Sequence, residues 1–194
     1  MMRDRFDKAY YDRYYRNPRT RATTPAAVKR QAAFIAAYLR HLEVPVRSVL
    51  DVGCGTGNLL RALGRAFPGV KTHGIEYSDY LCSRYGWEPG SVVDLDTDRR
   101  ADLVICNDVL GYLDDRACAK ALANLSAVTG SALYLGALTR EDLGLCDPER
   151  TDGTQIARPL RWYRRRLEPS FLPVGGGLFL RKPLNVTVWH LERA

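Results

Sequence analysis

The sequence contains no run of about 18 apolar residues, which is the length that a membrane-spanning helix needs. Its first seven residues carry too many charges for a signal peptide. The five cysteines are scattered, and no two of them form a Cys-x-x-Cys pair, so we expect neither a disulfide framework nor a zinc site. Together these features predict a cytoplasmic protein that does not insert into a membrane and binds no metal.

Lysine is also scarce: most of the 29 basic residues are arginine, and the sequence has no lysine-rich tail. The net charge of +7 is spread along the chain, with local clusters in residues 13–21 and 161–166. A basic balance of this kind bears on solubility and non-specific binding rather than on one function. RNA or DNA is therefore an alternative partner that the charge alone does not favour.

The 194 residues, 46% of them hydrophobic, suffice for one ordinary domain with a core. Residues 1–24 are polar and rich in tyrosine, and Thr24 with Pro25 predicts the start of a helix that ends near Pro45. We expect residues 1–45 to form a helical cap or lid and residues 46–194 to form the core of a single structural domain.

Strand and helix patterns alternate from residue 48 to residue 138, and this favours a doubly wound parallel sheet with helices on both faces. A short basic helix and closing strands joined by a hairpin follow. The expected strands cover residues 48–52, 72–76, 91–93, 103–106, 133–138, 171–174, 178–180 and 186–191. The expected helices between them cover residues 58–67, 80–85, 115–129 (with Gly130 as terminator) and 159–167.

The stretch Val49–Gly57 joins a short apolar run, a carboxylate and three glycines at alternate positions. It predicts a buried strand that ends in a loop without side chains and then enters a helix, so that a ligand can approach the backbone closely. The spacing differs from the Gly-x-Gly-x-x-Gly of dinucleotide-binding proteins, since the third glycine comes one residue early. Asp51 lies where a pyrophosphate would be unwelcome and where an ammonium group would be favoured.

This stretch resembles the first motif of the class I S-adenosylmethionine-dependent methyltransferases. Glu76 stands 25 residues after Asp51 and resembles the acidic residue at the end of the family's second strand. The segment Asp102–Leu110 resembles the family's fourth strand and the loop that follows it. The resemblance covers about residues 48–138. The implied fold is α/β, with a doubly wound, mostly parallel seven-stranded sheet, helices on both faces and an antiparallel C-terminal strand.

The resemblance implies that S-adenosylmethionine is the cofactor and S-adenosylhomocysteine the product. Asp51 would meet the ammonium group, Glu76 the ribose hydroxyls and Tyr77 one adenine face, while Val93 and Asp94 would read the adenine edge. Cys54 is a small residue within the glycine loop and belongs to the same cofactor-binding set. The cofactor-binding set is thus Asp51, Gly53, Cys54, Gly55, Gly57, Glu76, Tyr77, Val93, Asp94 and Asn107.

Methyl transfer from a sulfonium is an in-line displacement, which needs mainly alignment and a dry site. We expect Asn107, Asp108 and Tyr112 nearest the reaction. Many relatives carry histidine where Tyr112 stands, and a phenol with a pKa near 10 is a weak base at neutral pH. Residues expected in the lid or near the acceptor are Tyr11, Tyr14, Tyr15, Thr139 and Arg140.

The expected function is methyl transfer to a small-molecule acceptor by a monomer or homodimer. One alternative is an RNA or protein methyltransferase that uses the basic C-terminal region. The base-amine subclass is disfavoured, because Cys106-Asn107-Asp108-Val109 lacks the two prolines typical of its motif. A second alternative is a cofactor-binding partner protein without catalytic activity.

Overall fold

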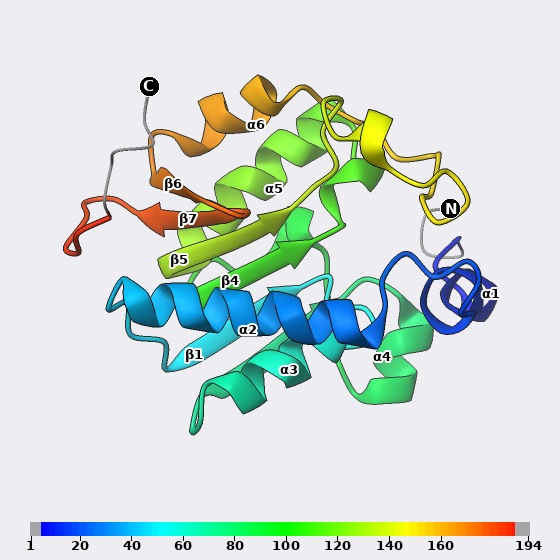
Figure 1. The fold of residues 1–194 in the computed structure, drawn as a ribbon, viewed down its shortest axis with the longest axis horizontal. Coiled ribbons are helices and arrows are strands. Elements are labelled where there is room, and N and C mark those ends of the chain that lie inside the picture. The colour runs from blue at the N-terminus through cyan, green and yellow to red at the C-terminus, as the bar shows by residue number, and fades with distance from the viewer. Residues whose placement is uncertain (1–4, 189–194) are drawn as a thin grey trace.

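The computed structural model describes residues 5–188, and its seven strands form one sheet in the order β3-β2-β1-β4-β5-β7-β6 (Figure 1). Strands β1 to β5 are parallel, and β7 runs antiparallel to its neighbours β5 and β6. This confirms the expected fold class. The strands are β1 (Ser48–Val52), β2 (Lys71–Glu76), β3 (Glu88–Pro89), β4 (Ala101–Asn107), β5 (Thr129–Gly136), β6 (Phe171–Gly175) and β7 (Leu178–Arg181).

Helices cover both faces of the sheet (Figure 1). The long helix α2 (Pro25–His41) and α3 (Asn58–Ala66) pack on one face, while α5 (Asp115–Val128) and α6 (Leu160–Leu167) pack on the other. Helix α4 (Asp79–Tyr85) contacts β2 and β3. No helix within residues 5–188 is long and apolar enough to cross a membrane.

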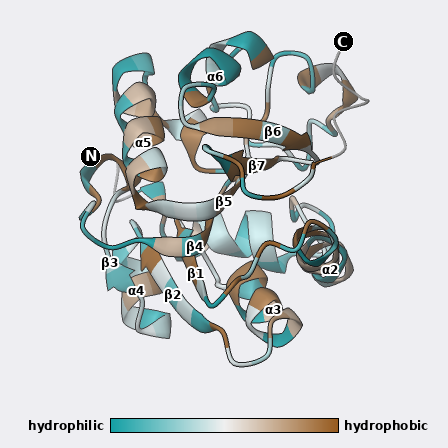
Figure 2. Cartoon of the chain, turned by 90° about the vertical axis from the view of Figure 1, so that its left-hand side faces the viewer, coloured by the Kyte–Doolittle hydropathy of each residue, from teal (hydrophilic) through white to brown (hydrophobic). Residues whose placement is uncertain are grey.

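The central strands feed two hydrophobic clusters, one on each face of the sheet. Along β4, Leu103 and Ile105 join the cluster under α2 and α3, whereas Val104 and Cys106 join the cluster under α5 and α6. Successive side chains of a strand point to opposite faces, so a strand covered on both faces must be apolar throughout. In Figure 2 the hydrophobic colouring accordingly gathers on strands that lie between the helices.

The helix starts follow the capping residues in the sequence. The Thr24 side chain accepts a hydrogen bond from the backbone N–H of Ala27, and Pro25 occupies the first position of α2. Asp114 caps α5 in the same way, accepting from the backbone N–H of Ala117 at 2.8 Å. Each cap satisfies a donor that would otherwise lack a partner at the helix start.

Several expected boundaries are wrong. The third strand is Glu88–Pro89 rather than residues 91–93, because the Ser91 side chain accepts from the N–H of Val93 and starts a 3₁₀ turn over Val92–Asp94. Gly130 does not terminate α5 but lies inside β5, which begins at Thr129 and ends at Gly136 instead of residue 138. Residues 186–188 form no strand, and the rest of the expected strand 186–191 lies outside the described residues.

The N-terminal segment lies at the carboxyl ends of the parallel strands (Figure 1). It consists of α1 (Lys8–Tyr11) and a π-helical turn, Asp12–Arg16. The loop that connects β5 to α6 reaches the same edge, since the Arg5 side chain donates to Asp152 at 2.7 Å. Ligands of such sheets bind outside the carboxyl ends of the strands, so the fold directs attention to this edge.

Candidate active site

The glycine loop between β1 and α3 has a backbone that only glycine adopts easily. Gly53, Gly55 and Gly57 have φ values of +77°, +56° and +71°. Trp87 fixes the loop from the side, because its indole Nε1–H donates to the carbonyl of Gly55 at 3.0 Å. A Cβ on Gly57 would overlap the Trp87 ring, so the indole occupies the space that the missing side chain leaves. The loop is therefore rigidly presented at the end of β1.

Asp51, the residue before the last one of β1, is a buried carboxylate with 3% of its surface exposed. Its carboxylate makes no hydrogen bond or ion pair with any residue in the described range 5–188. Burial, and secondarily the nearby charge of Glu76, raises the pKa of Asp51 to about 7. A buried anion without a partner is costly, and a cation placed beside it would remove that cost.

Glu76 ends β2 and faces the same loop. Its carboxylate accepts hydrogen bonds from the backbone N–H of Gly55 at 2.7 Å and of Ser78 at 2.8 Å. The Tyr11 hydroxyl donates to it at 3.5 Å. Burial still raises the pKa of Glu76 despite these donors. Two buried carboxylates, Asp51 and Glu76, thus lie beside the glycine loop.

The N-terminal tyrosines cover this loop. The Tyr15 ring lies 3.8 Å from the point where a Cβ of Gly55 would stand, and it packs on Tyr11 with ring centroids 5.1 Å apart. Tyr14 packs on Tyr10 at 5.0 Å. Burial raises the pKa of Tyr11 and Tyr15 above that of an ordinary phenol, so both are neutral at physiological pH. The expected lid tyrosines and the glycine loop are therefore brought together.

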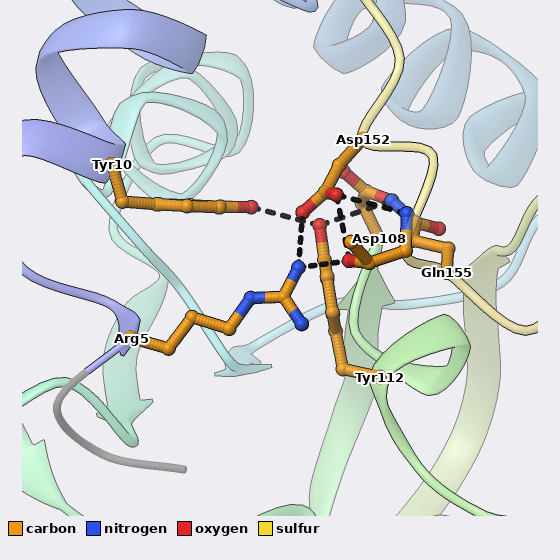
Figure 3. Close-up of polar contacts among 7 residues, drawn as sticks. Arg5, Tyr10, Asp108, Tyr112, Asp152 and Gln155 are labelled. Carbon is orange, nitrogen blue, oxygen red and sulfur yellow. Dashed lines mark hydrogen bonds and ion pairs between the residues drawn. The ribbon is translucent and has the colours of Figure 1, made fainter.

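A polar cluster lies at the end of β4, under the same segment (Figure 3). The Gln155 Nε2–H₂ donates to Asp108 at 2.9 Å and to the Tyr112 hydroxyl at 3.0 Å. The Tyr112 hydroxyl is also hydrogen-bonded to that of Tyr10 at 2.8 Å. Burial raises the pKa of Asp108 and of both phenols. Asp108 and Tyr112, expected near the reaction, therefore share one network.

Asn107 contacts the core helix α2 as well as the strand ends. Its Oδ1 accepts from the Gln31 side chain at 3.2 Å, and Gln31 also donates to the Tyr134 hydroxyl at 2.7 Å. Gly136 on the neighbouring β5 provides the room, because a Cβ there would lie 3.0 Å from Asn107 Cγ. The Asn107 side chain is thus held at the sheet edge by α2.

Some expected site residues make other contacts. Asp94 is 72% exposed and pairs with Lys120 of α5 at 2.9 Å, while the carbonyl of Val93 accepts from Asn124 at 2.8 Å. The Thr139 hydroxyl donates to Asp142 at 2.6 Å, and the Arg140 side chain donates to the carbonyl of Ala157. These contacts tie their own loops together, and the adenine and acceptor roles of these four residues stay predictions.

Two further expected residues lie close to the glycine loop or its covering segment. The Tyr77 ring meets Phe6 edge-on with centroids 6.5 Å apart. Cys54 is buried, and its burial raises the pKa of the thiol well above the usual value, so it stays protonated and unreactive. Within the described residues, no group of three or more His, Cys, Asp or Glu side chains has the arrangement of a metal site.

Sequence reasoning missed three residues that shape the site, namely Gln31, Trp87 and Gln155. None of them lies in a motif, and each reaches the site from an element distant in sequence. Arg158, which lies near the end of the loop between β5 and α6, is a buried arginine. Its guanidinium donates to Asp115 at 2.8 Å and to the carbonyls of Leu110 and Leu113, so it fixes the turn that carries Tyr112.

Comparison with known proteins agrees with this geometry. Residues 50–130 match the family model of a methyltransferase domain. The magnesium protoporphyrin IX methyltransferase ChlM from Synechocystis PCC 6803 is 20% identical, with 93% of this chain and 95% of that chain covered and a TM-score of 0.66. No curated protein sequence matches the chain.

Two further solved proteins have the same fold. DesVI from Streptomyces venezuelae is 18% identical, with 81% of this chain and 92% of that chain covered and a TM-score of 0.63. The sugar N-methyltransferase KedS8 from Streptoalloteichus sp ATCC 53650 is 20% identical, with 88% and 91% covered and a TM-score of 0.61. Residues 50–130 thus match a methyltransferase domain, and the strand order and the glycine loop agree with the fold of the class I methyltransferases that the sequence resembles.

Proposed function

We propose that the protein transfers the methyl group of S-adenosylmethionine to a small-molecule acceptor. The observation that carries this proposal is Asp51, a buried carboxylate that has no partner among residues 5–188 and lies two residues before Gly53 of the glycine loop. A ligand that brings an ammonium group and a sulfonium to this edge would neutralise the buried negative charge. S-adenosylmethionine has both groups.

The chain's own residues suit each part of this cofactor. Asp51 would hold the ammonium group, and the backbone of Gly53 to Gly57 would lie against the amino-acid portion. Glu76 would accept hydrogen bonds from the ribose hydroxyls, which are strong because the acceptor is charged. The Tyr11 hydroxyl, which donates to Glu76 in the ligand-free structure, would either be displaced by a ribose hydroxyl or share the Glu76 carboxylate with it. Bound in this way, the cofactor supplies an activated methyl group.

Residues 1–45 are proposed to cap the site, with the tyrosines of residues 10–15 as the lid. Tyr11 and Tyr15 lie over the glycine loop, and Tyr10 reaches the polar cluster at β4. This covering would exclude water and present aromatic faces to a sulfonium. An acceptor that must fit beneath such a cover is small.

The structural neighbours support a small acceptor. ChlM is named for magnesium protoporphyrin IX, and KedS8 is named as a sugar N-methyltransferase. The basic C-terminal region offers less for a nucleic acid, since Arg158 is buried and Arg166 stacks on Trp162 at 3.6 Å. The proposal therefore places the acceptor under the lid rather than on α6.

A label-partition experiment tests this proposal. The protein is incubated with S-adenosylmethionine that carries a tritiated methyl group, together with either a small-molecule cell extract, total RNA or a protein mixture. We expect time-dependent label only in the small-molecule fraction. Label in RNA or protein would favour the macromolecular alternative, and cofactor binding without any transfer would favour a non-catalytic partner protein.

A further inference from the structure

We propose that the acceptor is an amine and that Asp108 accepts the proton that its nitrogen gives up. This inference rests on the proposed methyl transfer and adds to it the class of acceptor and the role of one carboxylate.

Asp108 is held in one geometry at the end of β4. Its φ is +60°, a conformation that few residues other than glycine, asparagine and aspartate adopt. Its backbone N–H donates to the carbonyl of Gly136 at 2.7 Å. The following residue, Val109, fills the space beside Gly53 of the glycine loop. Asp108 therefore lies at the end of β4, one residue before the side chain that packs on the glycine loop.

Gln155 fixes the side chain of Asp108 from the opposite loop. The neighbouring Ile156 N–H donates to the carbonyl of Gly111 at 2.7 Å, which ties the two loops together. A Cβ on Gly111 would lie only 3.0 Å from the Cβ of Gln155, so the glutamine fits because residue 111 is glycine. Since Gln155 donates to Asp108 and to Tyr112, it acts as a positioning residue for both.

The charges around Asp108 leave it without a cation. Arg5 is the nearby guanidinium, and it pairs with Asp152 at 2.7 Å (Figure 3). Burial alone would raise the pKa of Asp152, but hydrogen bonds from Thr154 and the charge of Arg5 lower it, so that carboxylate is ionised and compensated. Within residues 5–188, no lysine or arginine pairs with Asp108. An ammonium group would pair with this half-buried carboxylate.

Aromatic rings pack on Tyr112, which shares the Gln155 amide with Asp108. The Phe6 ring meets Tyr10 at 5.1 Å and Tyr112 at 5.2 Å, both edge-on. The Arg5 guanidinium lies 5.2 Å from the Tyr112 ring centroid, so this ring already takes part in a cation–π contact. Ammonium groups are attracted to the faces of such rings. The charge of Asp108 and the aromatic rings near it thus favour the same chemical group, an ammonium.

The proton balance distinguishes an amine from an alcohol. An ammonium acceptor, with a pKa near 10 for an alkyl amine, gives one proton to the Asp108 carboxylate and becomes a neutral amine. The nitrogen lone pair then forms the N–C bond as the C–S bond breaks and its electron pair returns to sulfur. The product is an N-methylammonium ion and a thioether, and Asp108 later releases its proton to water. An aliphatic hydroxyl is a far weaker acid than an ammonium, and it would need a stronger base than a carboxylate.

The test uses matched probes on the full chain. Transfer of the tritiated methyl group is measured for amine and alcohol pairs of the same skeleton, cyclohexylamine with cyclohexanol and glucosamine with glucose. We expect label in the amines at rates at least about tenfold above the alcohols. Alcohols methylated as fast as amines, or no methylated amine in a protein that binds S-adenosylmethionine, would overturn the inference. Failure to bind the cofactor would instead overturn the proposed function.

Variants test the role of Asp108 itself. Asparagine tolerates the same φ, so Asp108→Asn keeps the backbone and removes the proton acceptor. We expect amine methylation to fall about 100-fold with unchanged cofactor affinity, as is typical for the loss of a general base. Asp96→Asn, at an exposed surface position, is the matched control. Gln155→Leu is a second variant, for which we expect a lower kcat and a higher KM for the amine. Unchanged rates in both variants would refute the role of Asp108.

Discussion

Replacing Asp51 by asparagine is expected to stabilise the ligand-free protein above pH 7. Asp51 is buried, and its pKa is raised to about 7 from an ordinary value of 3.8. The folded chain therefore holds this proton more tightly than the unfolded chain. Stability from this group is greatest below pH 4, falls as the pH rises to about 7 and is constant above that. At about 1.4 kcal/mol per pKa unit, the ionised carboxylate costs up to about 4 kcal/mol.

Urea unfolding of the ligand-free protein at pH 5 and pH 8 measures this cost. The wild-type free energy of unfolding should decrease more between the two pH values than that of Asp51→Asn, and the variant should be the more stable protein at pH 8. Asp96→Asn, which changes an exposed carboxylate, should behave like wild type. A variant that is less stable than wild type at pH 8 would show that the buried charge is compensated in a way that the structure does not contain.

Replacing Gly57 by alanine is expected to destabilise the protein strongly and to weaken cofactor binding. Gly57 has a φ of +71°, and a Cβ there would overlap the Trp87 ring and stand 2.9 Å from Cη2 of that ring. The left-handed backbone alone costs about 1–2 kcal/mol for a residue with a side chain. Displacing the indole would also break its hydrogen bond to Gly55. The total loss should be about 3 kcal/mol or more.

Gly69→Ala is the matched control for this substitution. Gly69 has a similar φ of +79°, but no atom lies within 4 Å of the position of its Cβ. This variant should lose only the backbone cost, so the difference between the two variants measures the overlap with Trp87. Equal losses of stability in urea unfolding would mean that the indole does not hold the glycine loop.

The elements of the core could be predicted from the sequence because local patterns determine them. The apolar run of β4, the caps Thr24 and Asp114 and the glycine loop each act within a few residues of themselves. The third strand could not be placed well, because β3 has only two residues and the Ser91 turn competes for the same segment. The place of Gly130 was also ambiguous in the sequence. Glycine is common at helix ends, but it also occurs in strands where a neighbouring backbone comes close, as Ala101 of β4 does here.

The site was predictable where one motif contains it and not where tertiary contacts build it. Asp51, Glu76 and Asp108 follow strands, so topology brings them to one edge of the sheet. Gln155 reaches Asp108 from 47 residues away, and Gln31 reaches Asn107 from 76 residues away. Such contacts depend on the path of loops and on helix rotation, which no local pattern specifies.

Calorimetric titration of the intact protein with S-adenosylmethionine tests the central claim most directly, namely that Asp51 and the glycine loop hold a cationic methyl donor. We expect binding of S-adenosylmethionine and S-adenosylhomocysteine. Affinity for both ligands should fall at least about tenfold in Asp51→Asn, since both carry the ammonium group and a hydrogen bond between charged groups contributes about 1.5–3 kcal/mol. No binding to the wild-type protein, or equal affinity of the wild type and the variant, would contradict the account.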